Sequence, residues 1–303
     1  MNPHRFDLVP LRLFIAVVDG GSLTAGAQAF GISLPAASKR IRELEAATGT
    51  VLLERGRGGA RTTSAGATLY RHARTVAGEV AQMAVAMSDY ARGVRGHLRI
   101  WANTSAVTGF LPEALAAVLR DNPRIAVDLE EANSEPIVDA VRDGRAELGV
   151  FADNVATGGL QVAVCDVDRL VLLTPAGHPL TRRRRIRFAD ALAHDFIGLD
   201  RGSSLVRLST RVAAEHQSPL KIRVHVRSFD AMARMIATGV GLGMLPWRGA
   251  APHAASMGLR MIELDDPWAL RRLLVGWRDR EMLDGPARTL LDQLLARTTV
   301  PGG

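Results

Sequence analysis

The sequence predicts a multidomain chain: an all-α winged helix-turn-helix domain over residues 1–64, a linker helix over 65–93, and an α/β domain over 94–303. Three observations predict this division. Short helical patterns follow one another in the first 50 residues, a 3.5-residue apolar repeat runs from residue 69 to 90, and strand and helix patterns alternate from residue 96 onward. The length of 303 residues also favours more than one domain.

Three short helices are expected at the N-terminus. Apolar residues recur at helical spacing from Leu8 to Val18, with Asp7 as a cap. Ser22 caps a second helix, which Gly31 ends, and Ser33 opens a third that runs to Gly49. Two helices joined by a tight glycine-containing turn form a helix-turn-helix unit, and the small residues of the second helix allow close packing.

The third helix has a polar side with unusual composition. Its apolar side holds Ile41, Leu44 and Ala47, whereas the residues opposite are small, hydroxylated or cationic. That side is either a solvated face or one that meets a polyanion. A DNA major groove admits such a helix, and Ser38, Lys39 and Arg42 can donate to base edges and phosphates. Ser22 and Thr24, at a helix N-terminus, can donate to phosphate.

A hairpin is expected after Gly49. Residues 51–53 form its first strand, GRGGAR its turn and residues 61–63 its second strand. This wing carries Arg55, Arg57 and Arg61. Its RGG-like triplet is also compatible with RNA binding, on weaker grounds.

A helix over residues 64–92 carries an apolar seam spaced 4, 3, 4, 3, 4, 3, made of Leu69, Ala73, Val76, Val80, Met83, Met87 and Tyr90. The regular repeat favours self-association into a homodimer over packing against its own domain. A dimer would hold two recognition helices at the separation of two half-sites on double-stranded DNA.

Charge and composition limit the function classes. The net charge is +7, and residues 1–95 hold twelve Lys/Arg against seven Asp/Glu, so most of the excess lies there. Local basicity fits nucleic acid or an acidic membrane surface, although an arginine-rich solvated surface also explains it. Apolar runs too short to span a bilayer and a start without an export signal predict a cytoplasmic protein with no membrane partner.

The second domain is expected to consist of α/β layers with mostly parallel strands. Ligands of such sheets bind beyond the carboxyl ends of strands, where helices begin. Asn103, Thr104 and Ser105 follow the first strand, and Ser203 and Ser204 follow the strand DFIGLD; these residues suit a small anion. The segment that contains Phe229 is a third candidate, and ordinary helix capping is the alternative for each serine.

No catalytic or metal-binding pattern is found. The sequence lacks GxSxG, HExxH and paired cysteines, and Cys165 is its single cysteine. The glycines at 239, 241 and 243 follow a helix and enter a strand, the reverse of a dinucleotide loop. We therefore expect no enzyme activity, cofactor or metal. The rival hypothesis is an α/β ligand-binding protein or enzyme with a basic N-terminal appendage.

Residues 7–70 resemble the DNA-binding region of LysR-type transcriptional regulators, through LRLFIAVVDGGSLTAGAQAFGISLPAASKRIRELEAATGTVLLER and RTTSAG. The resemblance implies that the start of the third helix and the wing meet DNA. With the hydroxyls and cations above, the predicted DNA-binding residues are Ser22, Thr24, Ser33, Pro35, Ala36, Ser38, Lys39, Arg42, Arg55 and Arg57. Leu34 stands where the family usually has glutamine, which alters the expected base preference at that position.

The resemblance continues through DVDRLVLLTPAGHPL at 166–180 and TGVGLGMLP at 238–246. It implies a two-lobed effector domain similar to type 2 periplasmic binding proteins, with lobe I over 96–166 plus 267–296 and lobe II over 167–266. A small effector would bind between the lobes, through Asn103, Thr104, Ser105, Ser203, Ser204 and Phe229. The family resemblance also implies a tetramer built as a dimer of dimers, contact with RNA polymerase, and transcriptional control as the function.

Overall fold

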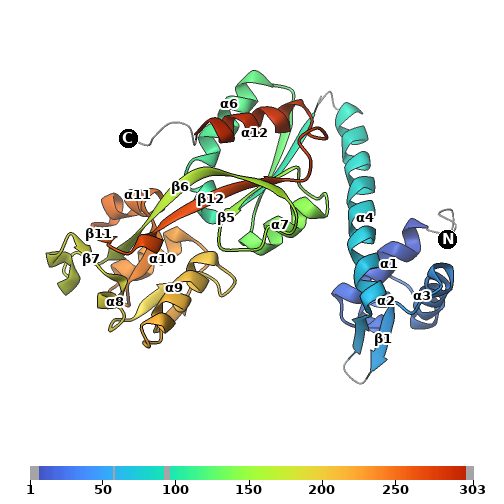
Figure 1. Cartoon of the computed structure of the whole chain (residues 1–303), viewed down its shortest axis with the longest axis horizontal. Helices are drawn as coiled ribbons and strands as arrows, with labels where there is room; N and C mark the ends of the chain where they lie inside the picture. The colour runs from blue at the N-terminus through green and yellow to red at the C-terminus, as the bar shows by residue number, and fades with distance from the viewer. Residues whose placement is uncertain (1–6, 57–58, 92–95, 298–303) are drawn as a thin grey trace. The chain divides into compact units, whose positions relative to one another are not determined.

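The computed structural model describes residues 7–56, 59–91 and 96–297 (Figure 1). The chain divides into two compact units: the first ends at Gly93, and nearly all of the rest forms the second. Within the described ranges, no helix combines the length and apolarity needed to cross a membrane.

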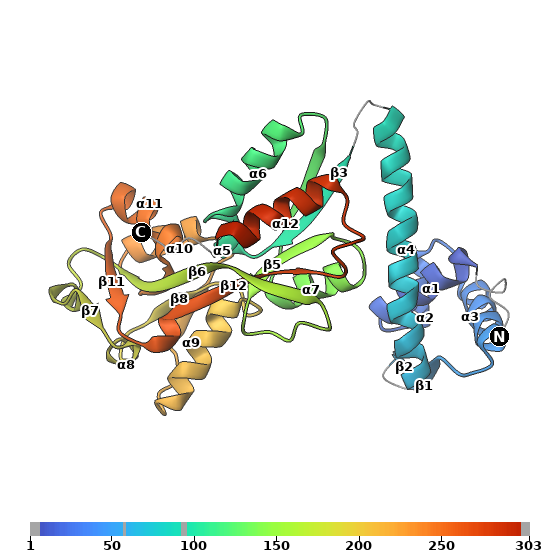
Figure 2. The ribbon, with the colours of Figure 1, turned by 45° about the horizontal axis from the view of Figure 1, so that its top comes forward.

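The N-terminal unit is a helix-turn-helix followed by a wing and a long helix (Figure 2). Side-chain oxygens of Asp7, Ser22 and Ser33 cap the first three helices, as the sequence predicts. Val51 is 60% exposed and precedes the first strand, which begins at Leu53. The elements are α1 (Leu8–Asp19), α2 (Leu23–Ala29), α3 (Leu34–Thr48), β1 (Leu53–Gly56), β2 (Gly59–Thr62) and α4 (Ser64–Ala91).

One apolar core holds this unit together. Phe14 and Val17 of α1 pack with Ile41 and Leu44 of α3, and all four are buried. Phe14, Ile41 and Leu44 are apolar positions of the two predicted helical patterns, and the opposite face of α3 is left exposed. Leu52, just before the wing, is also in this core, which fixes where the wing begins.

The second unit is built on a mixed sheet with strand order β4-β3-β5-β12-β6-β11-β7, to which β10 adds by pairing with β6. The expectation of mostly parallel strands is wrong at the centre: β12 and β6 run antiparallel to each other and to their other neighbours β5, β10 and β11. The strands are β3 (His97–Ala102), β4 (Ala126–Glu131), β5 (Leu148–Ala152), β6 (Gln161–Thr174), β7 (Arg185–Ile186), β10 (Gly243–Pro246), β11 (Arg260–Leu264) and β12 (Leu270–Trp277).

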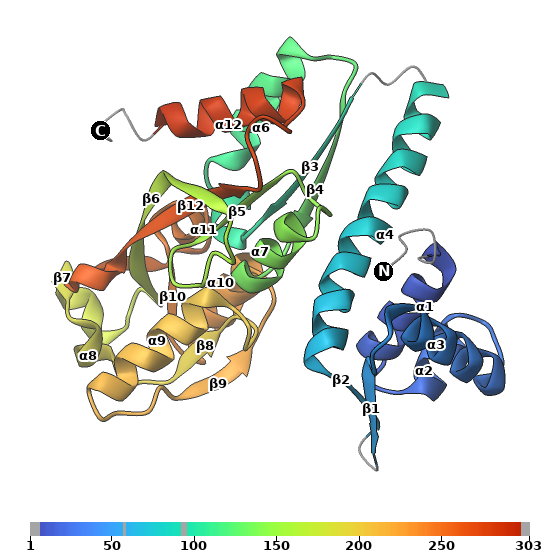
Figure 3. The ribbon, with the colours of Figure 1, turned by 45° about the vertical axis from the view of Figure 1, so that its right-hand side comes forward.

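Lobe I has helices on both faces of its sheet (Figure 3). One core joins the sheet to α6 and α12, through residues such as Leu111 and Leu290. A second core lies on the other face, where Ile137 of α7 packs near Phe151. The helices of this lobe are α5 (Thr104–Val107), α6 (Leu111–Asp121), α7 (Ser134–Arg142) and α12 (Gly285–Arg297).

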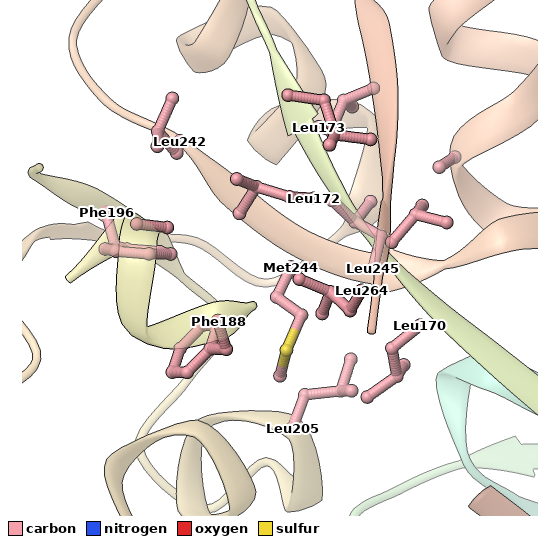
Figure 4. Packing of buried hydrophobic residues seen from close by; sticks show 14 of the residues in the cluster. Leu170, Leu172, Leu173, Phe188, Phe196, Leu205, Leu242, Met244, Leu245 and Leu264 are labelled. Atoms are coloured by element: carbon pink, nitrogen blue, oxygen red, sulfur yellow. The ribbon is translucent and has the colours of Figure 1, made fainter. Parts of the chain in front are cut away.

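Lobe II has a separate core, which includes Leu170, Phe188, Phe196 and Met244 (Figure 4). A small parallel pair, β8 with β9, lies beside the main sheet and is linked to it through the bridge between Phe196 and Leu242. The elements of this lobe are η2 (Pro179–Arg182), α8 (Phe188–Ala191), β8 (Phe196–Gly198), α9 (Ser204–Glu215), β9 (Ile222–His225), α10 (Phe229–Ala237), α11 (Trp247–Met257) and η3 (Pro267–Ala269).

Two strands connect the lobes. On β6, residues up to Cys165 belong to the core of lobe I, and residues from Leu170 onward belong to the core of lobe II. The chain leaves the core of lobe II at Ala269 and re-enters that of lobe I at Leu273 on β12. Strands β6 and β12 pair side by side across this change of core, from Gln161 opposite Trp277 to Arg169 opposite Leu270.

Candidate functional site

The exposed face of α3 consists of the residues that the sequence singles out. Pro35, Lys39 and Arg42 are exposed. Ala36 and Ser38 are half-buried, and their small side chains project little from the helix surface. Lys39 lies 3.9 Å from Glu43, and their side chains are 74% and 61% exposed. Such an exposed pair contributes little free energy, so the Lys39 ammonium remains available to another anion.

The hydroxyls of Ser22 and Ser33 cap their helices. Ser22 Oγ accepts from the N–H of Ala25 at 3.0 Å, and Ser33 Oγ accepts from that of Ala36 at 3.4 Å. Each hydroxyl still has its own hydrogen to donate. Ser22 and Ser33 can therefore cap their helices and still contact a phosphate. Thr24, in the first turn of α2, is exposed.

Glu45 joins α3 to the wing, a role that the sequence analysis missed. Its Oε1 accepts hydrogen bonds from the N–H groups of Leu52 at 2.9 Å and Leu53 at 3.3 Å. The N–H of Ala60 on β2 donates to the carbonyl of Gly21 at 2.8 Å. Helix and wing are therefore held in one fixed arrangement. A glutamate at the end of a helix before an apolar strand is the only sequence signal for this contact.

The wing is an antiparallel pair in which Arg55 faces Ala60 and Glu54 faces Arg61. Arg61 is exposed on β2. For Arg55 the structure describes the backbone alone, and Arg57 lies outside the described residues. The structure therefore places the wing and one of its three arginine side chains.

The seam of α4 has two parts. Ala73 is buried and Leu69 partly buried in the core of the N-terminal unit, where they pack as in an ordinary amphipathic helix. By contrast, Val76, Met83 and Met87 are 45%, 61% and 59% exposed. The side chain of Tyr90 is not among those described. Val76, Met83 and Met87 thus form an exposed apolar stripe on α4, and Val80 among them is half-buried.

Five of the six predicted effector residues come together between the lobes. Asn103, Thr104 and Ser105 of lobe I line a small cavity with Ser203 and Ser204 of lobe II. Asn133 and Ser134, which the sequence analysis did not single out, also line it. Phe229 does not: it is 2% exposed in the core of lobe II, where it packs against Gly249.

The polar groups of this cleft serve as caps and leave one donor free. Asn103 Oδ1 accepts from the N–H of Ala106 at 3.0 Å, and Ser203 Oγ accepts from that of Leu205 at 3.2 Å. Asn103 Nδ2 is buried and has no hydrogen-bond partner within the described chain. An unpaired buried donor costs free energy, so an acceptor at this position would be stabilising.

The lobes are closed over this cavity by contacts across the cleft. Asn133 Nδ2 donates to Asp200 Oδ1 at 3.0 Å, and Arg207 pairs with Glu135 at 3.4 Å. Asn154 Nδ2 donates to the carbonyl of Ser204 at 3.4 Å. The enclosed volume is about 10 Å³, which is the space of about one water, so an organic ligand requires the lobes to separate.

Arg271 lies beneath Ser105, inside the sheet. It is 4% exposed; its Nη2 donates to Ser105 Oγ at 3.0 Å and to the carboxylate of Asp168. Burial raises the pKa of Asp168, and the neighbouring guanidinium opposes that rise. The only sequence signal for this pair is the presence of charged residues in two otherwise apolar strands, VDRLVLL and LRRLLVGW.

Cys165 has no features of a reactive thiol. It is fully buried, and burial raises its pKa to about 12. The thiolate is the nucleophilic form, so this side chain is unreactive near neutral pH. Among the described residues, no cluster of His, Cys, Asp and Glu could hold a metal ion.

Comparison with known proteins places both units in one family. Residues 8–67 match the model of the bacterial regulatory helix-turn-helix protein, lysR family, and residues 91–299 match that of the LysR substrate binding domain. The transcriptional regulator BenM of Acinetobacter baylyi is 27% identical over 91% of each chain. Full-length CbnR, solved with its target DNA, is 20% identical with a TM-score of 0.62, over 97% of this chain and 100% of that one. The CcmR regulatory domain of Synechocystis, solved with 2-PG, is 24% identical with a TM-score of 0.62, over 68% of this chain and 98% of that one.

Proposed function

This chain belongs to the LysR family of DNA-binding transcriptional regulators, and from that premise we propose that α3 enters the major groove of its operator while a small anionic effector between the lobes controls transcription. The residues we assign to DNA are Ser22, Thr24, Ser33, Pro35, Ala36, Ser38, Lys39, Arg42, Arg55 and Arg57.

The exposed face of α3 is the observation that carries the DNA proposal. Its first turns combine small residues, which permit close approach, with the cations Lys39 and Arg42 further along. The Glu45 contacts join the start of the wing to α3. A rigid, basic helix of this shape suits a duplex groove, and CbnR, a structural neighbour, was solved with its target DNA.

Lys39→Ala tests this assignment. Removing one phosphate contact should weaken binding broadly across sequences and reduce the slope of log affinity against log salt by about 1. The measurement is fluorescence anisotropy with a duplex from the chain's own promoter region, over a range of salt concentrations.

The matched control is Lys221→Ala, which removes an exposed lysine from lobe II. It should leave both affinity and slope unchanged. Equal effects of the two substitutions would show a nonspecific charge effect and contradict the placement of α3.

The cleft supports a small carboxylate or similar anion as effector. Asn103 Nδ2, Ser105 and Ser203 offer donors, and the twelve-residue α9 begins at Ser204 with its positive end towards the cavity. We assign the effector to Asn103, Thr104, Ser105, Ser203 and Ser204, without Phe229. CcmR, another neighbour in fold, was solved with 2-PG.

The exposed stripe on α4 supports a homodimer formed through this helix. The family implies that dimers then pair through their effector domains into a tetramer and that the bound complex contacts RNA polymerase. We propose that the protein acts in the cytoplasm as a regulator, with no catalytic activity, cofactor or metal. An effector achieves control through its different affinity for the two arrangements of the assembly.

A further inference from the structure

The first residue of α3 exposes a large apolar side chain. Leu34 is 45% exposed, whereas Ile41 and Leu44, the other large apolar residues of this helix, are buried in the core of the N-terminal unit. An exposed apolar residue is ordinary on a protein surface, so only its position and its neighbours can give it a function. Here that position is the start of the helix that we assign to DNA.

The backbone that carries Leu34 is held in place. Ser33 Oγ caps the helix by accepting from the N–H of Ala36 at 3.4 Å, and Pro35 restricts the backbone in the first turn. Leu34 therefore lies between two conformationally restricted neighbours. Its side chain projects from a fixed point, which reduces the conformational entropy lost on contact with a partner.

Leu34 begins a row of three residues along one face of α3. Leu34, Ser38 and Arg42 are spaced four positions apart, and residues at this spacing are neighbours on a helix surface. Arg42 Nε donates to the carbonyl oxygen of Ser38 at 3.3 Å, so its side chain lies along this row. The row therefore presents an apolar group, then a hydroxyl and then a cation.

The order along this row matches the contacts that a recognition helix makes. Such a helix brings its N-terminal residues to base edges, and cations elsewhere on it bind phosphates. In that placement Leu34 lies at a base edge, and Lys39 and Arg42, which are exposed further along, lie near phosphates. The placement rests on the proposed function, in which α3 enters the major groove.

The chemistry of leucine selects one kind of base. Its side chain has no hydrogen-bond donor or acceptor, so it cannot pair with the polar groups that bases present in the major groove. Burying those polar groups against it without a partner costs free energy. Thymine is the base that carries a methyl group in the major groove. An apolar contact with this methyl group is thus the favourable interaction open to Leu34.

We propose that Leu34 is a specificity-determining residue whose side chain packs on the C5-methyl group of a thymine in each half-site of the operator. Lys39 and Arg42 contact phosphates, which are the same in every sequence. Affinity and sequence preference then come largely from different residues of the same helix.

Duplexes from the chain's own promoter region, each with one thymine replaced by uracil, test the proposal. Uracil lacks the C5-methyl group and keeps the hydrogen-bonding groups of thymine. At one position in each half-site this replacement should raise the Kd of the unmodified chain about fourfold, the effect of removing one methylene-sized group from an apolar contact. Fluorescence anisotropy measures each Kd.

Two substitutions of Leu34 connect this effect to its side chain. Leu34→Ala should weaken binding to the thymine duplex and abolish the difference between thymine and uracil. Leu34→Gln should move the preference at this position to adenine, whose major-groove edge pairs with an amide. Circular dichroism checks that the variants are folded, as expected for changes at an exposed residue.

Val9→Ala is the matched control, because it shortens an apolar side chain that is 39% exposed on α1. It should keep the fourfold difference. A thymine-to-uracil effect that persists in Leu34→Ala, or operator binding with no uracil-sensitive position, would overturn this inference and leave the proposed function intact. A chain that binds no duplex from its promoter region would overturn both.

Discussion

Gly26 lies where α2 packs tightly against Val17 of α1. A Cβ at this position would lie 2.4 Å from Cγ2 and 2.7 Å from Cα of Val17, well inside ordinary van der Waals contact. The small residues of α2 were expected to admit a neighbouring helix, and here that neighbour is α1. Because the Val17 backbone cannot move without moving α1, only glycine fits.

Gly26→Ala should therefore lower the free energy of unfolding of the N-terminal unit by about 1–3 kcal/mol, the usual cost of overpacking. Urea unfolding followed by circular dichroism measures it. Gly285→Ala is the control: no atom lies within 4 Å of its Cβ position and the residue begins α12, so stability should stay the same or rise slightly. Equal stability of both variants would contradict the tight contact.

The residues that sequence reasoning found differ in kind from those it missed. Ser22, Ser33 and Ser203 cap helices, and capping depends on neighbours a few positions away, so a local pattern is sufficient. The contact between Arg271 and Asp168 joins residues 103 positions apart. It depends on the register of β12 against β6, which no local pattern specifies.

At the level of elements, α4 shows what a repeat can and cannot predict. The 3.5-residue spacing gave the correct helix, but it does not name the surface that each apolar residue meets. Ala73 meets its own domain, whereas Met83 and Met87 remain exposed. Packing against the chain's own domain and packing against a second copy of the helix require the same periodicity, because both surfaces are apolar.

Met83→Glu combined with Met87→Glu tests the dimer. Charges at the centre of an apolar helix interface are costly to bury, so the variant should shift from dimer towards monomer and lose affinity for an operator with two half-sites. Sedimentation equilibrium measures the shift. Met282→Glu, at a residue that is 79% exposed in the other unit, is the control and should keep the dimer. A double variant that remains dimeric would remove α4 from the interface.

At the level of the whole chain, the two-lobed architecture follows from alternating strand and helix patterns together with family resemblance. The antiparallel centre of the sheet does not follow from those patterns. The direction of these strands depends on how β6 and β12 pass from one lobe to the other. The closure of the lobes through Asn133 with Asp200 and Glu135 with Arg207 was likewise unpredictable. Those pairs join distant segments that only the folded chain brings together.

Ser105→Ala with Ser203→Ala tests the effector cleft. In thermal-shift measurements with a panel of small carboxylates, the unmodified chain should be stabilised by its effector and the double variant should not. DNA binding without effector should be unchanged, since both substitutions lie in the second unit. Ser256→Ala, an exposed serine of α11, should keep the full response. Unchanged ligand-dependent melting in the double variant would exclude these serines from the site.

The crossing of β6 and β12 has a further consequence for how the chain could be rebuilt. The segment between Arg169 and Leu270 leaves lobe I and returns at adjacent positions, because these two residues are paired. Lobe II is therefore an insertion whose two ends lie side by side. A short hairpin or the corresponding lobe of a relative could take its place at these two ends. We expect that a lobe exchanged at this one junction leaves the N-terminal unit unchanged, since that unit ends at Gly93.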